Sequence, residues 1–299
     1  MNIGTIPAKI ARLDPAREAL IDVDSGRRMT FGALDERVRR LSNALMGELS
    51  LEKGDRVAIL SRNCIEYMEI YYACARVGMI AQPINWRLGE AEMARILADG
   101  SPRLVVVSAQ YSELIPGLKA SSTADNWLSF GEGGDGSYDA LINASADNEP
   151  SESVSIGGDD PMLILYTGGT TGESKGALHT HRSLFMGMIN QTVAERVVTT
   201  DVYMLTGQMF HIPVALAMNY HAHGCAMVLI NFDARLALET IEKERVSAFL
   251  GITTMLNWMM ADEKFAEFDL SSLRNIQYGG GPMPHSVVAA ALAAFPCTI

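Results

Sequence analysis

Apolar residues recur along the chain at two different spacings, and each spacing predicts one kind of element. A first set follows Thr30 at steps of three or four positions: Phe31, Leu34, Val38, Leu41 and Leu45. These steps place the side chains on one stripe of a helix. Similar patterns predict helices over 66–77, 91–99, 234–244 and 285–294. Short continuous apolar runs predict buried strands over 56–60, 79–84, 103–107, 162–166, 225–232, 246–250 and 275–278.

Strands and helices therefore alternate in both halves of the chain, which predicts an α/β fold with parallel-type sheets flanked by helices. Between the halves, residues 121–160 contain the Gly-rich stretch 131–136 and a Ser-Glu-Ser stretch at 151–153. Such composition favours an exposed connection. We expect a first α/β subdomain over 1–120, an acidic exposed linker over 121–160 and a second α/β subdomain over 161–299. The sequence shows no repeat at a fixed period between the two.

The net charge of −11 is concentrated in one segment. Residues 121–160 carry nine Asp and Glu residues and no Lys or Arg, so they contribute −9 and the rest of the chain is close to neutral. A nucleic-acid interface needs clustered positive charge. The nearest candidate, Arg37 with Arg39 and Arg40, lies on the first predicted helix beside acidic residues and is interpreted as a solvated helix face. The charge pattern therefore argues against a nucleic-acid partner.

Cysteine spacing and hydropathy narrow the cellular setting. The four cysteines, Cys64, Cys74, Cys225 and Cys297, form no C-x-x-C pair. This disfavours a disulfide framework or a zinc site and favours a reduced, cytoplasmic location. No apolar run approaches the ~18 residues needed to cross a bilayer, and the charged N-terminal residues do not form a secretory signal. We therefore expect no transmembrane segment.

One segment stands apart in its chemistry, Tyr166–Gly176, which directly follows a predicted strand. It holds four glycines, three threonines and one lysine in eleven positions. Glycines let backbone N–H groups converge on an anion, threonine hydroxyls add donors, and Lys175 adds a charge suited to phosphate. A simple Gly-rich hairpin turn would need neither the Thr-Thr pair nor the lysine. The segment is therefore interpreted as a phosphate-binding loop.

Two common phosphate loops do not match this segment. A Walker A loop places Gly and Lys side by side, whereas Glu173 and Ser174 precede Lys175 here. A dinucleotide-binding loop has the spacing G-x-G-x-x-G, which the four glycines do not follow.

The segment resembles the signature loop of the AMP-forming adenylating enzymes, a family that includes acyl-CoA synthetases, peptide-synthetase adenylation domains and firefly luciferase. That loop reads Tyr-Thr-Ser-Gly-Thr-Thr-Gly, two variable positions, then Lys-Gly. This chain has Gly168 where Ser is most common, as in bacterial fatty-acyl-CoA ligases, and Ser174 where Pro is common. Other segments agree with the family in order along the chain: Met29–Phe31, Ala75–Gly78, Pro83–Leu88, Thr180–Leu184, Met209–His211 and Tyr278–Pro284.

The resemblance implies a fold and an extent. The chain looks like the large N-terminal domain of an adenylate-forming enzyme, truncated before the C-terminal lid. The family's Tyr-Gly-x-Thr-Glu motif, its ribose-binding Asp and its lid Lys would all follow Ile299. We therefore expect the 299-residue chain itself to be inactive.

The resemblance also implies an activity for the complete protein. It would use ATP to activate a small hydrophobic carboxylic acid to an acyl-adenylate, and transfer the acyl group to coenzyme A, with Mg²⁺ bridging the phosphates. The implied phosphate-binding residues are Thr167, Gly168, Gly169, Thr170, Thr171, Gly172 and Lys175. Gly280, Gly281 and Pro282 would form a wall for the adenine and the acyl group. No metal ligand is expected within this chain.

His211 is the catalytic candidate, because the resemblance places it at the carboxylate end of the acyl pocket. The alternative is a core or capping histidine beside Phe210. His221 and His223 have no third ligand nearby, and residues two positions apart do not share a helix face, so a structural role is expected for them.

Two alternatives to this function remain open at this point. The acceptor could be another group, such as a carrier-protein thiol or an oxygen. The chain could be a non-catalytic truncated remnant. The chain length or aromaticity of the acid and any homo-oligomer formation are also left open.

Overall fold

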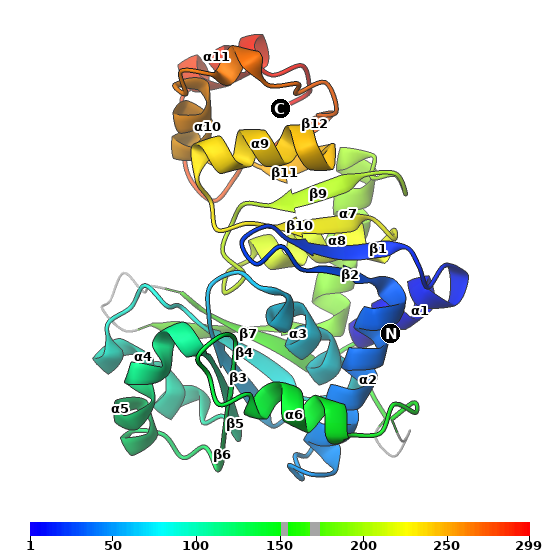
Figure 1. The fold of residues 1–299 in the computed structure, drawn as a ribbon, viewed down its shortest axis with the longest axis vertical. Coiled ribbons are helices and arrows are strands. Elements are labelled where there is room, and N and C mark those ends of the chain that lie inside the picture. Colours follow the sequence, from blue (N-terminus) through cyan, green and yellow to red (C-terminus); the bar gives the residue numbers. More distant parts are fainter. Residues whose placement is uncertain (151–154, 168–173) are drawn as a thin grey trace. The chain divides into compact units, whose positions relative to one another are not determined.

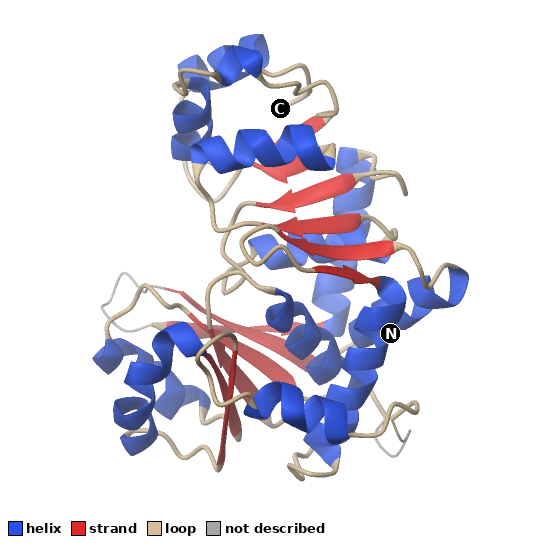
Figure 2. Ribbon diagram, viewed as in Figure 1, coloured by secondary structure: helices blue, strands red, loops and turns tan. Residues whose placement is uncertain are grey.

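The protein forms two compact units in a computed structural model, which describes residues 1–150, 155–167 and 174–299. Each unit is built on one sheet with helices packed along it (Figures 1 and 2). Unit 1 comprises Met1–Pro15, Phe31–Gly187 and Met209–Ile212, and unit 2 comprises Ala16–Thr30, Met188–Gln208 and Pro213–Ile299.

Unit 1 contains the strands β3 (Arg56–Leu60), β4 (Ile80–Ile84), β5 (Leu104–Ser108), β6 (Asn126–Phe130), β7 (Pro161–Thr167) and β8 (Lys175–Thr180). Its helices are η1 (Ile3–Thr5), α1 (Ile6–Leu13), α2 (Phe31–Met46), α3 (Ile65–Val77), α4 (Glu90–Gly100), η2 (Ala109–Leu114), α5 (Ile115–Ala120), α6 (Ser137–Ala144) and the first part of α7 (His181–Glu195).

Unit 2 contains the strands β1 (Glu18–Asp22), β2 (Arg28–Thr30), β9 (Val202–Leu205), β10 (Ala226–Leu229), β11 (Ala248–Leu250) and β12 (Asn275–Gln277). Its helices are the remainder of α7, α8 (Pro213–Ala222), α9 (Ala234–Glu244), α10 (Thr253–Met260), η3 (Phe265–Glu267) and α11 (His285–Ala294).

The strand orders of the two sheets correspond, except that the antiparallel edge pair comes last along the chain in unit 1 and first in unit 2. The order is β6-β5-β3-β4-β7-β8 in unit 1 and β12-β11-β9-β10-β1-β2 in unit 2. Neighbouring strands are parallel except at one edge of each sheet, where β8 is antiparallel to β7 and β2 to β1, so the expected parallel-type sheets are mixed. The β1–β2 pair thus holds in unit 2 the place that β7–β8 holds in unit 1. No fixed sequence period accompanies this likeness, because unit 2 takes these two strands from far ahead of β9–β12.

The core of unit 1 lies on both faces of its sheet. Strands β4 and β5 are buried along their whole length, as parallel strands covered by helices on both sides should be. On one face, Met93 and Leu97 of α4 and Leu118 of α5 pack against Val105 and Val107 of β5. Every residue of α3 is buried as well. The apolar run that predicts each of these strands is therefore explained by burial on two sides.

The core of unit 2 is gathered around α9. Leu238 and Ile241 of this helix pack in one cluster with Met204, Val228 and Phe249 of the sheet. The last residues of the chain join the sheet edge, where Thr298 forms a parallel bridge to Asn275 of β12.

Most predicted elements are confirmed. The helix after Thr30 is α2, and Gly78 ends α3 in the left-handed conformation, with φ +82°, that glycine adopts without strain. The other predicted helices correspond to α4, α9 and α11, and the predicted strands correspond to β3, β4, β5, β7, β10, β11 and β12.

The expected linker over 121–160 is wrong for its described part, because this segment folds as part of unit 1. Strand β6 pairs in parallel with β5, and α6 buries Tyr138 and Ile142. The Tyr138 hydroxyl donates a hydrogen bond of 2.9 Å to the buried Glu69 carboxylate. Composition misled the prediction because acidic and Gly-rich turns surround these few buried side chains.

The expected subdomain limits change for the same reason. Unit 1 extends through the expected linker to Gly187. Residues 16–30, although they come early in the sequence, belong to unit 2 and complete its sheet.

The basic residues of α2 are not a freely solvated face, because they hold the acidic segment. Arg37 forms ion pairs with Glu69 and, at 2.8 Å, with Asp139. Arg40 donates a hydrogen bond of 2.7 Å to the Ser145 carbonyl. Farther along, Arg76 of α3 pairs with Glu149. Much of the negative charge of the segment is therefore balanced within unit 1. No helix among the described residues has the length and apolarity needed to span a membrane.

Replacing Arg37 with Met should lower the free energy of unfolding by about 3–5 kcal/mol, because it leaves the Glu69 carboxylate buried without its cation. Urea denaturation of the 299-residue chain measures this effect. The double variant Arg37→Met/Glu69→Gln should recover most of the loss, since it removes the buried charge as well.

Arg103→Met is the matched control. It breaks the ion pair between Arg103 and Asp125, whose side chains are 49% and 58% exposed, respectively. The free energy of unfolding should fall by less than about 1 kcal/mol. A loss for Arg37→Met no larger than for the control would contradict the account.

Candidate functional site

The antiparallel pair β7–β8 places both ends of the Gly- and Thr-rich segment side by side. Thr167, the last residue of β7, lies opposite Lys175, the first residue of β8, and both side chains are exposed. On its other side β7 pairs in parallel with β4, where Leu163 lies opposite Ala81. The two predicted phosphate-binding residues Thr167 and Lys175 are therefore brought together on a strand pair anchored in the sheet.

The other predicted members of the phosphate set, Gly168, Gly169, Thr170, Thr171 and Gly172, lie outside the described residues. Their part in the site stays a prediction from the sequence.

Tyr166 fixes β7 directly before this segment. Its hydroxyl donates a hydrogen bond of 2.6 Å to the Asp99 carboxylate near the end of α4. Burial, with a smaller contribution from this bond, raises the pKa of the Tyr166 hydroxyl, so it stays protonated as a donor. Gly176 lies opposite Tyr166, and a Cβ at this glycine would come within 2.6 Å of the Ile164 side chain and 3.2 Å of the Tyr166 ring. The glycine after Lys175 therefore lets β8 approach β7 closely.

His211 belongs to the short segment Met209–Ile212 of unit 1. The Met209 N–H donates to the Asn63 side chain at 2.9 Å, and the Met209 carbonyl accepts from the Tyr71 hydroxyl at 2.6 Å. The Phe210 and His211 rings lie 4.6 Å apart. These bonds anchor the backbone beside His211 to α3 and to the residues just before it.

Partial burial lowers the pKa of His211, and the positive charge of Arg87 lowers it further. The imidazole is therefore neutral at pH 7. In that form one ring nitrogen donates a hydrogen bond and the other accepts one. Such a ring can orient an anionic group without adding a full positive charge.

Positive charge and aromatic surface meet at the carboxyl ends of β3 and β4. The guanidinium groups of Arg62 and Arg87 each lie 5.0 Å from the Trp86 ring centre, and Trp86 stacks on Tyr111 at 6.5 Å. In open α/β sheets this edge is where ligands bind. Arg62 was not among the site residues predicted from the sequence. Its one local signal is a basic residue just beyond a strand end.

The predicted adenine and acyl wall lies in unit 2, in the turn that follows β12. Gly280 has φ +74°, a conformation that favours glycine. A Cβ on Gly281 would meet no atom within 4 Å, so this position is open to an approaching ligand. The Pro282 carbonyl accepts a hydrogen bond of 3.0 Å from Thr253 of α10. Of the three predicted wall residues, only Gly280 has a backbone conformation that favours glycine.

His221 and His181 have structural contacts. His221 is fully buried, with Nε2 2.8 Å from the Ala19 carbonyl, and burial lowers its pKa to about 4. His181 begins α7, and its Nδ1 accepts a hydrogen bond of 3.1 Å from the Ile3 N–H. Within residues 1–150, 155–167 and 174–299, no group of three or more His, Cys, Asp and Glu residues could hold a metal ion.

A family model described as AMP-binding enzyme matches residues 8–299. This chain belongs to that family. The long-chain-fatty-acid–CoA ligase FadD13 of Mycobacterium tuberculosis is 32% identical over 293 residues, which cover 96% of this chain and 57% of the relative. The feruloyl-CoA synthase of Amycolatopsis sp. is 32% identical over 287 residues, which cover 95% of this chain and 55% of the relative.

The likeness extends to solved structures of the AMP-binding enzyme family. The inhibitor-bound N-terminal domain of FACL13 from Mycobacterium tuberculosis aligns with a TM-score of 0.89 at 30% identity, covering 99% of this chain and 74% of that one. The expected fold, that of the N-terminal domain of adenylate-forming enzymes, is therefore confirmed. This chain spans little more than half the length of the two curated relatives.

The His211 imidazole should titrate below the ordinary histidine pKa of about 6.5, because of its burial and the nearby Arg87 charge. A proton NMR titration of the 299-residue chain measures the midpoint. Arg87→Met should move the midpoint upward, and Arg103→Met should leave it unchanged.

The lowered pKa of His211 also makes the stability of the fold depend on pH. Since the unfolded chain binds this proton more readily, the stability that His211 contributes falls as the pH drops below about 6.5. A midpoint at or above 6.5 would contradict the assigned environment.

Proposed function

We propose that this chain forms the nucleotide- and acid-binding part of an enzyme that activates a hydrophobic carboxylic acid with ATP and transfers the acyl group to coenzyme A. The observation that carries the proposal is the pairing of Thr167 with Lys175 at the two ends of the Gly- and Thr-rich segment. Family membership supports it. The names of both relatives are those of enzymes that make CoA thioesters, from a fatty acid in one case and an aromatic acid in the other.

The first half-reaction brings together two anions. A carboxylate oxygen of the acid attacks the α-phosphorus of ATP, the bond from this phosphorus to the bridging oxygen breaks, and pyrophosphate leaves with the electron pair. Such a step depends on positioning and charge neutralisation more than on covalent chemistry by the protein.

The residues of unit 1 suit this requirement. Lys175 would place its ammonium group against the β- and γ-phosphates, and Thr167 would donate from its hydroxyl at the other end of the segment, with Gly168–Gly172 between them. Neutral His211 would orient the attacking carboxylate without pairing with it as a cation. In unit 2, the resemblance of the turn over 278–284 to the family's motif suggests that Gly280, Gly281 and Pro282 contact the adenine and the acyl group.

The second half-reaction transfers the acyl group. The sulfur of coenzyme A attacks the carbonyl carbon of the acyl-adenylate, and the thiol loses its proton. The bond from this carbon to the phosphate oxygen breaks, and AMP leaves with that oxygen and the electron pair. Arg62 and Arg87 give the carboxyl edge of β3 and β4 a positive charge, which favours polyanionic substrates.

Mg²⁺, when bound, would reduce the negative charge of the ATP phosphates. The described residues gather donors for phosphate and no carboxylate cluster for the metal, so no residue of this chain is assigned to it. The cytoplasmic location and the inactivity of the 299-residue chain alone remain predictions.

Lys175→Met tests the phosphate assignment in the complete protein. It should lower kcat/KM for ATP by roughly 10²-fold in acid-dependent pyrophosphate exchange, because a fixed positive charge beside the departing β- and γ-phosphates is lost. Lys243→Met is the matched control, since Lys243 is a highly exposed lysine of α9, and it should leave the rate unchanged. Equal rates for both variants would remove Lys175 from the site.

A further inference from the structure

A polar network in unit 2 ends directly before the turn assigned to the adenine and the acyl group. Glu195 is the last residue of α7, and its Oε2 accepts hydrogen bonds from the Tyr220 hydroxyl at 2.8 Å, from the Gln191 amide at 3.2 Å and from the Gln277 amide. The Gln277 amide oxygen in turn accepts from the Tyr203 hydroxyl at 3.0 Å. Both ends of the Gln277 amide are therefore held.

Gln277 is the last residue of β12, so the turn over 278–284 starts from it. Its main chain is fixed as well, because its carbonyl accepts a hydrogen bond of 2.8 Å from the Gly251 N–H. Tyr278, the next residue, is half exposed. Gln277 is thus the last tightly held residue before the chain turns outward.

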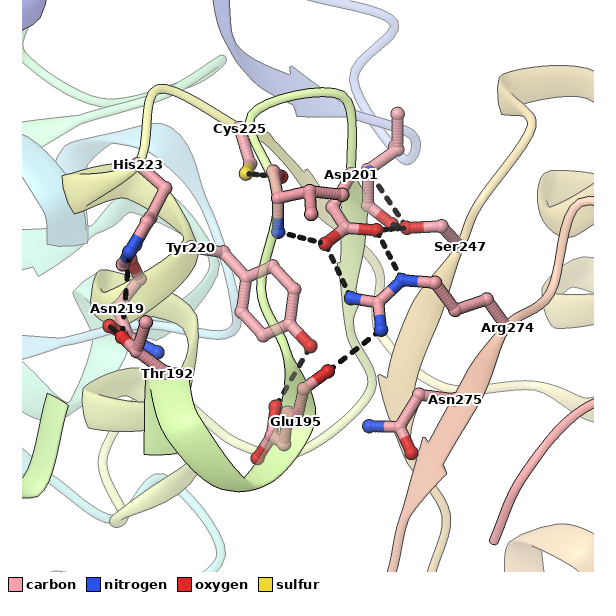
Figure 3. Close-up of polar contacts among 12 residues, drawn as sticks. Thr192, Glu195, Asp201, Asn219, Tyr220, His223, Cys225, Ser247, Arg274 and Asn275 are labelled. Atoms are coloured by element: carbon pink, nitrogen blue, oxygen red, sulfur yellow. Dashed lines mark hydrogen bonds and ion pairs between the residues drawn. The ribbon is translucent and has the colours of Figure 1, made fainter. Parts of the chain in front are cut away.

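The groups around Glu195 give the network rigidity. The Tyr203 and Tyr220 rings stack at 4.4 Å. Arg274, the residue before β12, forms a bidentate ion pair with Asp201 and donates a hydrogen bond of 2.7 Å to the Glu195 carbonyl (Figure 3). Strand β12 is therefore tied to the end of α7 at both of its ends.

The charged and titratable groups that face the Glu195 carboxylate are Arg274 with its partner Asp201, and the hydroxyls of Tyr203 and Tyr220. Arg274 is already neutralised by Asp201. The donors on the carboxylate itself are neutral. The charge-assisted bond from Gln277 to Glu195 is consequently a strong restraint on the amide.

We propose that Glu195 is a positioning residue, which fixes the start of the turn over 278–284 through Gln277. The inference rests on the proposed function for what the turn binds. A displacement of such a wall by about 1 Å is enough to cost roughly 10²-fold in rate. Glu195 and Gln277 are 82 positions apart in the sequence, so only the fold joins them.

An exchange of the two side chains tests the proposal. Glu195→Gln removes the charge from the acceptor and Gln277→Glu sets two carboxylates together, so each weakens the pair. The double variant Glu195→Gln/Gln277→Glu restores one carboxylate facing one amide. Amide hydrogen exchange of residues 275–284 in the 299-residue chain should be about tenfold faster in each single variant and close to wild type in the double variant.

The pH dependence gives a second readout. Gln277→Glu sets two carboxylates side by side, which can share one proton at low pH and repel when both ionise. Exchange of this segment in Gln277→Glu should therefore quicken as the pH rises, and the double variant should lose this dependence. Tyr138→Phe is the matched control, since it removes a Tyr–Glu hydrogen bond from unit 1, and it should leave exchange of residues 275–284 unchanged.

Unchanged exchange in Glu195→Gln, or no rescue in the double variant, would overturn the proposal. In the complete protein, the single variants should raise KM for ATP and the acid more than they lower kcat, and an unchanged KM would overturn the link to binding. If exchange responds as expected but the wild-type protein uses no ATP, the proposed function fails while the positioning role of Glu195 stands.

Discussion

The pairing of β7 with β8 is the constraint on which the account of this protein depends. A phosphate site needs a cation and hydroxyl donors held at fixed places, and the register that sets Thr167 opposite Lys175 supplies both from one strand pair. The pair is itself held, because β7 joins the parallel sheet through β4 and Tyr166 bonds to Asp99. Gly176 allows the close approach of the two strands. The two strands that flank the Gly- and Thr-rich segment are therefore part of the sheet.

Unit 2 has a corresponding strand order, but its antiparallel edge pair does not flank the Gly- and Thr-rich segment. There the antiparallel pair β1–β2 takes the corresponding edge, and the candidate wall is the turn after β12, the strand at the opposite edge of the sheet. The residue before that turn, Gln277, is held by hydrogen bonds with Glu195 and Tyr203, which lie far from it in the sequence. The two units therefore use one topology in different ways.

The local elements could be predicted from the sequence because their residues are buried in a regular pattern. The stripe from Phe31 to Leu45 gives α2, and the run Val105–Val107 gives β5. The segment over 121–160 could not be read in this way, because only a few side chains such as Phe130 and Tyr138 are buried among acidic and Gly-rich turns. The strand pair β1–β2 was also missed, since its place beside β10 depends on residues some 200 positions away.

In the candidate site, too, some features could be predicted from the sequence and others could not. The Gly- and Thr-rich segment could be predicted from its residue types and their spacing, and the turn at Gly280 from its resemblance to a motif of the family. The contacts that hold them were not visible, because Asp99, Asn63 and Glu195 have no unusual sequence context. His211 combines the two cases. Its motif was recognisable in the sequence, whereas its lowered pKa depends on burial in the fold and on the nearby Arg87.

The most direct test of the central claim is the identity of the nucleotide product. The complete protein would be incubated with ATP, Mg²⁺, coenzyme A and a series of acids from aliphatic to aromatic, and the nucleotides separated by chromatography. The account predicts AMP and pyrophosphate in amounts that depend on the acid. Formation of ADP, or release of AMP at the same rate without any acid, would contradict it.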